Sequence, residues 1–405
     1  MKRDSSGDSA AAATMSLPNH PSRERFMTNH EAYVGFDVHK ETIAVAIAVG
    51  GPGGDAFSFG TIKNSKHAIG LLAKKLARTH DKLSFCYEAG PCGYAIYRQL
   101  VGLGHACQVV APSLIPTKPG DHIKTDHRDA MTLARLLRAG ELTAVWVPDQ
   151  AHEAMRDLVR GRIAVMESVR KARQQLQGFL LRQDLRYSGK TSWTSLHSDW
   201  LRSLTFEYPA HHVLVQELLY VIEEGQRRQQ RIEQQIEALL PTWSMAPIIS
   251  AIQALRGVSL IAALILAAEI GDFRRFNSPR QLMAYLGLVP SEFSSGKRVT
   301  RGSITKAGSA RARRVLIEGA WAYQRRASVS KRHMQRLLNL PARIREIAWD
   351  AQLRLCGRYR RLAAKGPPAC PCSAGMNATR SRSCSWTAPS RGAGCAGSCV
   401  AWRAP

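Results

Sequence analysis

The sequence predicts a mixed α/β domain, followed by a region of long helices and a mainly α-helical C-terminal domain. Strand-like and helix-like segments alternate up to about residue 147, which is the pattern of a sheet flanked by helices. From 151 to 240, apolar residues recur at spacings of three and four, which indicates helices. With 405 residues and 45% hydrophobic content, the chain can bury more than one core. We expect an α/β domain at 31–150, a helical linker at 151–245 and a C-terminal domain at 246–365.

The elements of the first domain follow from runs of apolar and β-branched residues separated by Gly and Pro turns. The first two runs lie a few residues apart and predict a β-hairpin. The loop from Pro112 to His122 contains three prolines and a glycine, and we expect it to move over the active site. The sequence predicts strands near 32–37, 42–49, 56–62, 83–88, 106–110 and 143–146, and helices near 65–79, 93–103 and 126–139.

The two ends of the chain differ in composition from the rest. Residues 1–30 are rich in Ser, Ala, Pro and mixed charge, and we expect a disordered leader. Residues 366–405 contain no Leu, Ile, Phe, Asp, Glu or Lys, so we expect a disordered tail of the kind that a frameshift produces. The longest apolar stretch, from Val258 to Ile270, is too short to cross a bilayer. We therefore expect a cytoplasmic protein with no membrane partner.

The region of long helices leaves two questions open. Its apolar positions form a seam that suits packing within the chain or dimerisation. Its cationic face is interpreted either as a contact for nucleic acid or as a solvated surface. The seam consists of Leu218, Leu219, Val221, Ile222, Ile232, Ile236, Leu239 and Leu240, and the cationic face of Arg156, Arg160, Arg162, Arg170, Lys171 and Arg173.

Charge indicates the class of partner. The chain has 57 Lys and Arg against 31 Asp and Glu, a net charge of +26. A surplus of this size favours a polyanion such as DNA or RNA and predicts salt-sensitive binding.

Four carboxylates in the first third of the chain predict a metal site. Asp37 ends the first predicted strand, and Glu88 ends another strand before a Gly-Pro turn. Asp126 and Asp129 open a helix and, three residues apart, face the same way. Such oxygen ligands suit Mg²⁺ or Mn²⁺, which promote phosphoryl transfer. For the last two acids, roles as a helix cap and a first-turn acid are equally compatible with the pattern.

In order along the chain, four motifs resemble the DEDD transposases of the insertion-sequence one-ten family, which are related to the pilin-gene invertase. The motifs are Gly35-Phe36-Asp37-Val38-His39-Lys40, Glu88-Ala89-Gly90-Pro91, Lys124-Thr125-Asp126-His127-Arg128-Asp129-Ala130, and a C-terminal set running from Tyr285 to Gly308. The resemblance implies an RNase H-like (RuvC-like) first domain and a C-terminal transposase domain. It also implies that DNA strands are cut and rejoined, guided by an RNA encoded by the element itself.

The same resemblance implies that the serine preceding glycine is a nucleophile, which maps to Ser295. Ser294 and Ser303 are rivals. A phosphoserine ester to DNA would form in a composite site with the metal, across subunits of a homo-oligomer (dimer or tetramer). Cations around this serine are candidates for binding nucleic acid: they are Lys297, Arg298, Arg301, Lys306, Arg311, Arg313 and Arg314.

Two features complete the C-terminal domain. Residues 255–262 resemble the turn of a helix-hairpin-helix unit, which approaches a phosphate through backbone N–H groups. Ser278 and Pro279 predict the cap and first residue of a further helix.

Other function classes are weighed against this one. An actin-like kinase needs Gly and Thr directly after the first acid, whereas Val38-His39-Lys40 follows Asp37. A RuvC-like junction-resolving nuclease would hydrolyse with water and need no serine. A catalytically impaired remnant that still binds nucleic acid is the third alternative.

Overall fold

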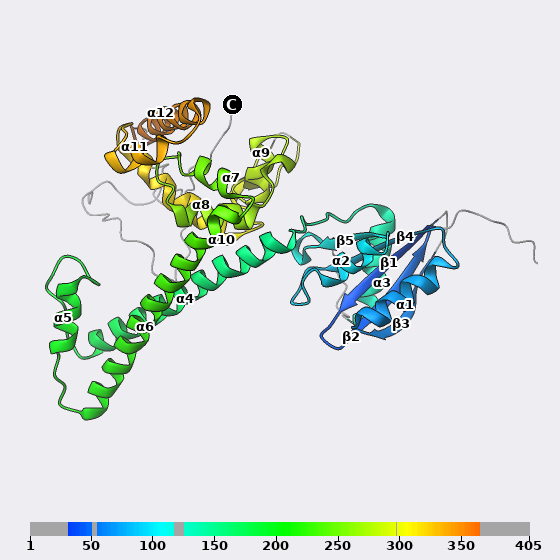
Figure 1. Ribbon diagram of the computed structural model, residues 1–405, viewed down its shortest axis with the longest axis horizontal. Helices are drawn as coiled ribbons and strands as arrows, with labels where there is room; N and C mark the ends of the chain where they lie inside the picture. Colours follow the sequence, from blue (N-terminus) through cyan, green and yellow to red (C-terminus); the bar gives the residue numbers. More distant parts are fainter. Residues whose placement is uncertain (1–30, 51–54, 117–124, 297, 365–405) are drawn as a thin grey trace, which may run out of the picture. The chain divides into compact units, whose positions relative to one another are not determined.

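The computed structural model describes residues 31–50, 55–116, 125–296 and 298–364. The expected leader, the expected tail, part of the loop after Pro112 and Lys297 lie outside these residues. The chain divides into two compact units, one ending at Val147 and one beginning at Pro148. A mixed α/β sheet unit followed by a mostly helical unit confirms that part of the predicted fold class (Figure 1). The expected subdivision near residue 245 stays a prediction.

The first unit is built on a five-stranded sheet in the order β3-β2-β1-β4-β5. Strand β1 pairs antiparallel with β2 and parallel with β4, while β2–β3 is antiparallel and β4–β5 parallel. The prediction of a sixth strand near 143–146 is wrong, because this segment forms only an isolated β-bridge between Ala144 and Val110. The strands are β1 (Glu31–Val38), β2 (Thr42–Val49), β3 (Ala56–Lys63), β4 (Lys82–Glu88) and β5 (Ala106–Val110).

Helices cover both faces of this sheet (Figure 1). On one face, α1 (Lys66–Ala77) and α2 (Ala95–Gly102) bury apolar side chains against Phe36 and Tyr87. On the other face, α3 (Asp126–Ala139) packs on the strands through small and apolar residues. Side chains alternate along each strand, so neighbouring residues face α1 and α2 on one side and α3 on the other. This alternation determines which face Asp37 on β1 and Glu88 on β4 point to.

The second unit begins with two long helices, α4 (Gln150–Arg182) and α6 (Pro209–Leu239), which pack along each other (Figure 1). Six of the eight residues of the predicted seam pack within the unit, since Leu218, Leu219, Ile232 and Leu240 are partly buried against its clusters. Ile222 and Ile236 are buried against other residues of the unit, whereas Val221 and Leu239 are about half exposed (47% and 46%). The seam thus serves packing within the chain, except at Val221 and Leu239.

Shorter elements complete the second unit. Most of the apolar stretch from Val258 to Ile270 forms the largely buried helix α8 (Leu260–Ile270), and Ser278 and Pro279 start α9 (Pro279–Tyr285) as predicted. The remaining elements are α5 (Ser195–Ser203), α7 (Ala246–Ile252), α8 (Leu260–Ile270), α9 (Pro279–Tyr285), β6 (Pro290–Glu292), β7 (Arg301–Ile304), α10 (Ala310–Ala320), α11 (Lys331–Leu337) and α12 (Ala342–Ala364), with 3-10 turns at Pro112–Leu114, Leu240–Thr242, Phe273–Arg275 and Trp321–Gln324.

Paired charges join α4 to the helices around it. Arg160 donates two hydrogen bonds to the buried carboxylate of Glu269 on α8, at 2.9 and 3.0 Å. Arg156 donates to the Ala268 carbonyl oxygen at 2.9 Å, and Arg162 pairs with Glu233 on α6. The expectation of an exposed cationic face is therefore wrong for Arg156 and Arg162, which are buried. Among the described residues, no helix has the length and apolar character needed to cross a membrane.

Candidate metal centre and the β6–β7 hairpin

Asp37 and Glu88 lie at the carboxyl ends of two adjacent parallel strands. Phe36 on β1 is opposite Tyr87 on β4, so Asp37 and Glu88 are the next residues on their strands. Both aromatic rings are buried among α1 and α2. Because side chains alternate along a strand, the two acids point to the opposite face, which α3 covers. The structure thus places these two predicted residues at one edge of the sheet and on one face.

Asp126 and Asp129 lie in the first turn of α3. The residue that caps this helix is Thr125, whose Oγ1 accepts a hydrogen bond from the Arg128 backbone N–H at 3.4 Å. A capping role for Asp126 is therefore wrong, and Asp126 is the first helical residue. Since capping does not engage its carboxylate, that group can face the sheet edge.

Gly35 determines how closely α3 approaches β1. A Cβ atom at this position would lie 2.3 Å from the Ala130 carbonyl oxygen and 2.6 Å from the Ala134 backbone nitrogen. Real Cβ contacts are longer than this, so any side chain here would push α3 off the strand. The glycine two residues before Asp37 thus brings the start of the helix, with its acids, to the end of the strand.

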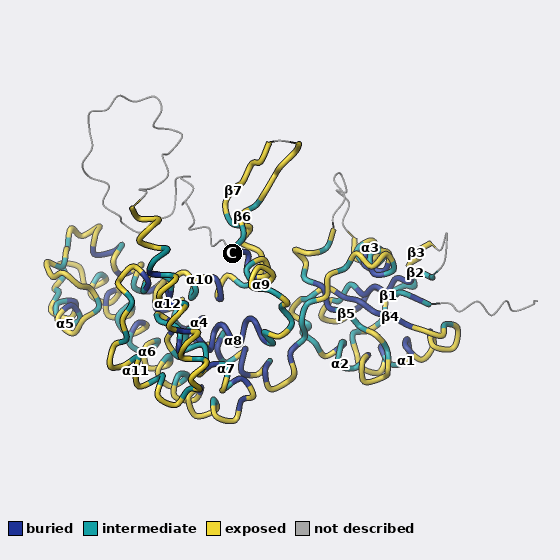
Figure 2. The backbone as a smooth tube through the Cα atoms, turned by 90° about the horizontal axis from the view of Figure 1, so that it is seen from above, coloured by how far each residue is buried: buried dark blue, intermediate teal, exposed yellow. Residues whose placement is uncertain are grey.

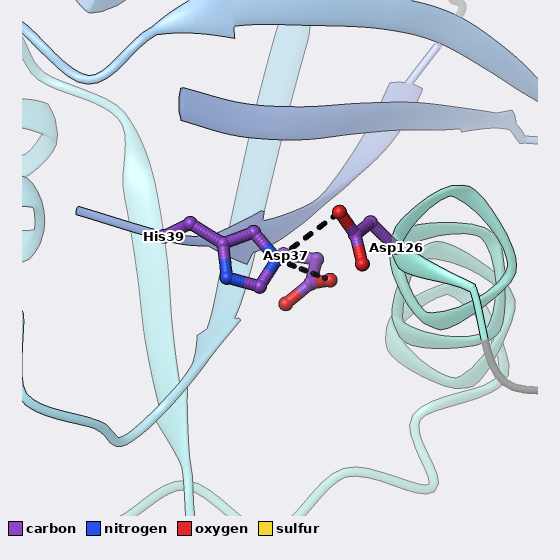
Figure 3. A group of neighbouring side chains, drawn as sticks. All are labelled: Asp37, His39 and Asp126. Atoms are coloured by element: carbon purple, nitrogen blue, oxygen red, sulfur yellow. Dashed lines mark ion pairs between the residues drawn. The ribbon is translucent and has the colours of Figure 1, made fainter. Parts of the chain in front are cut away.

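His39 joins two of the predicted acids into a close group (Figure 3). Its Nε2 atom lies 3.3 Å from Asp37 Oδ2 and 3.3 Å from Asp126 Oδ2. Ligand atoms of the three side chains all lie within 4.8 Å of one another, and this is a group that can hold a metal ion. Asp37 is mostly buried, whereas the side chains of His39 and Asp126 are 49% and 63% exposed. The group is therefore accessible to an ion from solvent.

The charges around Asp37 favour the binding of a cation. Burial raises the pKa of the Asp37 carboxyl above its usual value, and the nearby carboxylates of Asp126 and Asp129 raise it further. His39 opposes this effect only in part. A divalent cation would remove the repulsion among these acids. Two carboxylates and one imidazole are a donor set that fits such an ion.

The other two predicted acids stand outside the close group. Glu88 is exposed at the sheet edge, and Asp129 lies one helical turn beyond Asp126. The structure therefore brings Asp37 and Asp126 together and leaves Glu88 and Asp129 near the same edge. Sequence reasoning missed His39 as a candidate ligand, although it lies two residues after Asp37 in the first motif.

In the second unit, Ser295 lies at the end of the exposed β6–β7 hairpin, which extends away from α9 and α10 (Figure 2). Backbone hydrogen bonds join Phe293 to Thr300 at 2.9 Å, and Ser295 to Arg298 at 3.1 Å in both directions. Gly296 takes a φ of +56°, which suits the tight turn.

The ladder places side chains on two different faces of the hairpin. One face carries Glu292, Ser294 and Arg301: the Ser294 hydroxyl donates to Glu292 at 2.9 Å, and Arg301 donates to the same carboxylate at 3.2 Å. By the alternation of the strands, Ser295 and Arg298 share the other face. The two candidate serines therefore face different surroundings.

The predicted nucleic-acid residues also differ in their environments. Arg298, Lys306 and Arg311 are exposed, and Lys297 lies outside the described residues. Arg301 and Arg314 are exposed but pair with Glu292 and Glu318. Arg313 is buried, and its guanidinium donates to the carbonyl oxygens of Leu286, Ala307 and Gly308. Arg313 thus holds the loop before α10.

Comparisons with known proteins show the family of the chain. Residues 34–183 match the DEDD transposase domain of the IS110 type, and residues 249–335 match the transposase IS116/IS110/IS902 family. A protein of Sinorhizobium fredii named "putative transposase y4qE" is 49% identical over 336 residues, which cover 83% of each chain. The transposase for insertion sequence element IS1533 of Leptospira borgpetersenii is 30% identical over 338 residues, covering 83% of this chain and 97% of that one. The chain belongs to the IS110 family of insertion-sequence transposases.

Proposed function

We propose that this transposase cuts and rejoins DNA strands with a divalent metal ion, Mg²⁺ or Mn²⁺, held at the edge of the N-terminal sheet. The observation that carries the proposal is the close group of Asp37, His39 and Asp126. Glu88 and Asp129 belong to the same site, because they lie at the same sheet edge and on the same helix turn. The sheet order β3-β2-β1-β4-β5, with acids at the ends of β1 and β4, supports an RNase H-like fold.

The donor atoms suit this chemistry. A bound divalent ion stabilises the charge that develops on a phosphodiester during displacement. Asp37 is held in place by the sheet, and Asp126 by the capped start of α3. His39 Nε2 stands between them and either binds the ion directly or orients the two carboxylates.

Ser295 supplies the nucleophile in our proposal. Its Oγ attacks a DNA phosphorus, an Oγ–P bond forms, and the bond from phosphorus to one deoxyribose oxygen breaks. The serine proton ends on that leaving oxygen. A hydroxyl of the second DNA strand then attacks the phosphoserine ester, which forms the new phosphodiester and returns the proton to Ser295. No net bond energy is lost, because one phosphodiester replaces another.

The hairpin supports Ser295 over Ser294. The Ser294 hydroxyl donates to Glu292, which also accepts from Arg301, so this serine belongs to a closed network. Ser295 is exposed, has no side-chain hydrogen bond within the described residues, and shares its face with the Arg298 guanidinium. A cation on that face suits the charge that develops on an attacked phosphate.

Trapping the covalent protein–DNA adduct tests the proposal. Ser295→Ala should abolish the adduct, while the matched control Ser294→Ala should retain it. Denaturing gels with end-labelled DNA carrying the element's termini would measure both. Persistence of the adduct in Ser295→Ala, or its loss only in Ser294→Ala, would reject Ser295. Cleaved DNA without any adduct would favour a nuclease that uses water.

Family membership extends the proposal to partners. We propose that the chain binds an RNA encoded by its own element and acts as a homo-oligomer on DNA. The surplus of cations supports binding to both nucleic acids. Co-purification of element RNA with the protein and the mass of the assembly in solution would test the two statements separately.

A further inference from the structure

A small pocket in the helical unit is lined by cations. It lies between the turn at Leu255–Gly257 and helix α11, and has a volume of about 200 Å³. Arg256, Arg332, Arg336 and His333 line it together with two serines. No Asp or Glu is among the described residues that line the pocket. At about 30 Å³ for each water molecule, the space holds roughly six waters, or a phosphate group with a few waters.

Two of the three arginines are held in place by the protein. Arg256 Nη1 donates to the Arg326 carbonyl oxygen at 2.7 Å, and Arg336 Nη1 donates to the Val258 carbonyl oxygen at 3.1 Å. A guanidinium has five N–H donors, so most of their donors stay available. His333 Nε2 donates to the Ala254 carbonyl oxygen at 2.9 Å, which fixes the imidazole at the pocket wall. The wall is therefore pre-organised.

Arg332 differs from its neighbours because it makes no hydrogen bond or ion pair within the described part of the chain. It is exposed and lies in the same wall, one helical turn before Arg336. Three guanidinium groups around one small pocket repel one another, and nothing in its described lining compensates for this. An anion would turn that repulsion into attraction and would engage the free donors.

We propose that this pocket binds a phosphate group of a nucleic-acid backbone. The proposal rests on the proposed function only in that the partner is DNA or RNA. The contacts come from side chains rather than from the turn: Gly257 has a φ of +82°, and a Cβ there would lie 2.3 Å from the Gly319 carbonyl oxygen. This glycine thus lets the turn pack closely on α10, the helix-hairpin-helix expectation stays a prediction, and in our proposal the arginine side chains hold the ligand.

The test measures equilibrium binding by fluorescence anisotropy over a series of salt concentrations. The protein carries Ser295→Ala, so that no covalent adduct forms, and the probes are a labelled DNA duplex and a labelled structured RNA, each alone. Arg332→Gln should weaken binding of the occupying nucleic acid about 3- to 10-fold and lower its salt slope by about 1. Arg345→Gln is the matched control, because Arg345 is exposed on α12, outside the pocket lining.

Each outcome decides the matter. A loss for DNA alone or RNA alone identifies the source of the phosphate. If Arg332→Gln binds both probes as well as the parent protein, and the parent binds them with normal salt dependence, the pocket does not bind a backbone phosphate. The proposed function is unaffected by that result. Equal losses of affinity in Arg332→Gln and Arg345→Gln would show that only the net charge of the protein matters, and they would also reject phosphate binding in the pocket. A parent protein that binds neither probe overturns both proposals. Circular dichroism and thermal melting check that each variant folds.

Discussion

The edge of the N-terminal sheet gathers carboxylates, whereas the pocket beside α11 gathers guanidinium groups. At the sheet edge, burial raises the pKa of the Asp37 carboxyl, and the neighbouring carboxylates of Asp126 and Asp129 raise it further, while His39 lowers it. In the pocket, three arginines face no acid among the described lining residues. In both regions the protein leaves charge of one sign in excess. Such charge costs free energy unless a ligand of opposite sign binds, and this is the common basis of the two proposals, a cation in the first region and a phosphate in the second.

Charges elsewhere in the helical unit show the contrasting case. Glu269 and Arg160 compensate each other between α8 and α4, and Arg162 pairs with Glu233. These groups hold helices together and need no ligand. The net charge of +26 therefore does not by itself locate the binding surfaces. What matters is which charges lack a partner in the folded chain.

The largest expected effect comes from removing one charge of the acidic region. Asp37→Asn keeps the size of the side chain but removes a proposed metal ligand, so DNA strand exchange should fall at least about 10³-fold, or about 4 kcal/mol. Mn²⁺ binding, followed by electron paramagnetic resonance, should weaken in parallel. Asp81→Asn is the control, because Asp81 is an exposed acid just before β4, at the opposite end of that strand from Glu88. Normal Mn²⁺ binding by Asp37→Asn would show that Asp37 does not hold the metal ion.

A smaller effect should follow from moving the acids without changing their charge. In Gly35→Ala the new Cβ collides with the backbone of α3, and we expect a loss of about 1–3 kcal/mol in the free energy of unfolding. Mn²⁺ affinity should fall as well, because Asp126 and Asp129 move with the helix. Urea unfolding and Mn²⁺ titration measure the two effects. Gly102→Ala is the control, since a Cβ there meets nothing within 4 Å. If Gly35→Ala is destabilised but keeps full Mn²⁺ affinity, the close packing of α3 on β1 is not needed for metal binding.

The smallest expected effect concerns a charge that is already compensated. Glu269→Gln should lower the free energy of unfolding at pH 7 by about 1–2 kcal/mol, a discounted value because the Arg160 side chain is 41% exposed. Glu318→Gln, at an exposed pair with Arg314, should change stability little. Salt-dependent nucleic-acid binding should be unchanged in both variants. A binding defect in Glu269→Gln with normal stability would contradict its role in helix packing.

The same pair gives a pH dependence. Burial raises the pKa of Glu269, but the Arg160 and Ser309 hydrogen bonds and the charge of Arg160 outweigh burial and leave the pKa below its usual value of 4.5. The ionised pair therefore stabilises the fold fully above about pH 4.5, and this stabilisation is lost as the pH falls through the lower folded-state pKa. Urea unfolding between pH 7 and pH 3 should show a steeper decline for the wild type than for Glu269→Gln.

Much of the α/β unit was predictable from sequence, because alternating and helical periods report burial directly. All five strands of its sheet and its three α-helices lie close to the expected ranges. The sixth strand failed for a tertiary reason: Val145 and Val147 pack against the core, and Val145 donates one backbone hydrogen bond to Val109, but no ladder follows. A run of apolar residues indicates that a segment is buried, but it does not show that the segment pairs with a neighbouring strand.

The candidate site was predictable only in part. Asp37 and Asp126 stand out as acids at element ends, but their contact depends on the close packing of α3 on Gly35, which no local pattern encodes. His39 has no strong pattern of its own. Among cations, sequence does not separate a buried Arg313, which satisfies backbone carbonyl groups, from an unpartnered Arg332. Partners of this kind are assigned by tertiary contacts between distant segments.

The contact between α3 and β1 has a thermal consequence. The interface consists of small residues such as Ala44, Ala46, Ala130 and Ala134, packed close to the backbone at Gly35. Small side chains have few rotamers, so they cannot rearrange step by step as the temperature rises. We therefore expect α3 to stay packed on β1 until it separates in one step. The spacing of the acids should therefore hold constant up to the temperature at which the sheet itself melts. Metal affinity and sheet structure should then disappear together, in one transition.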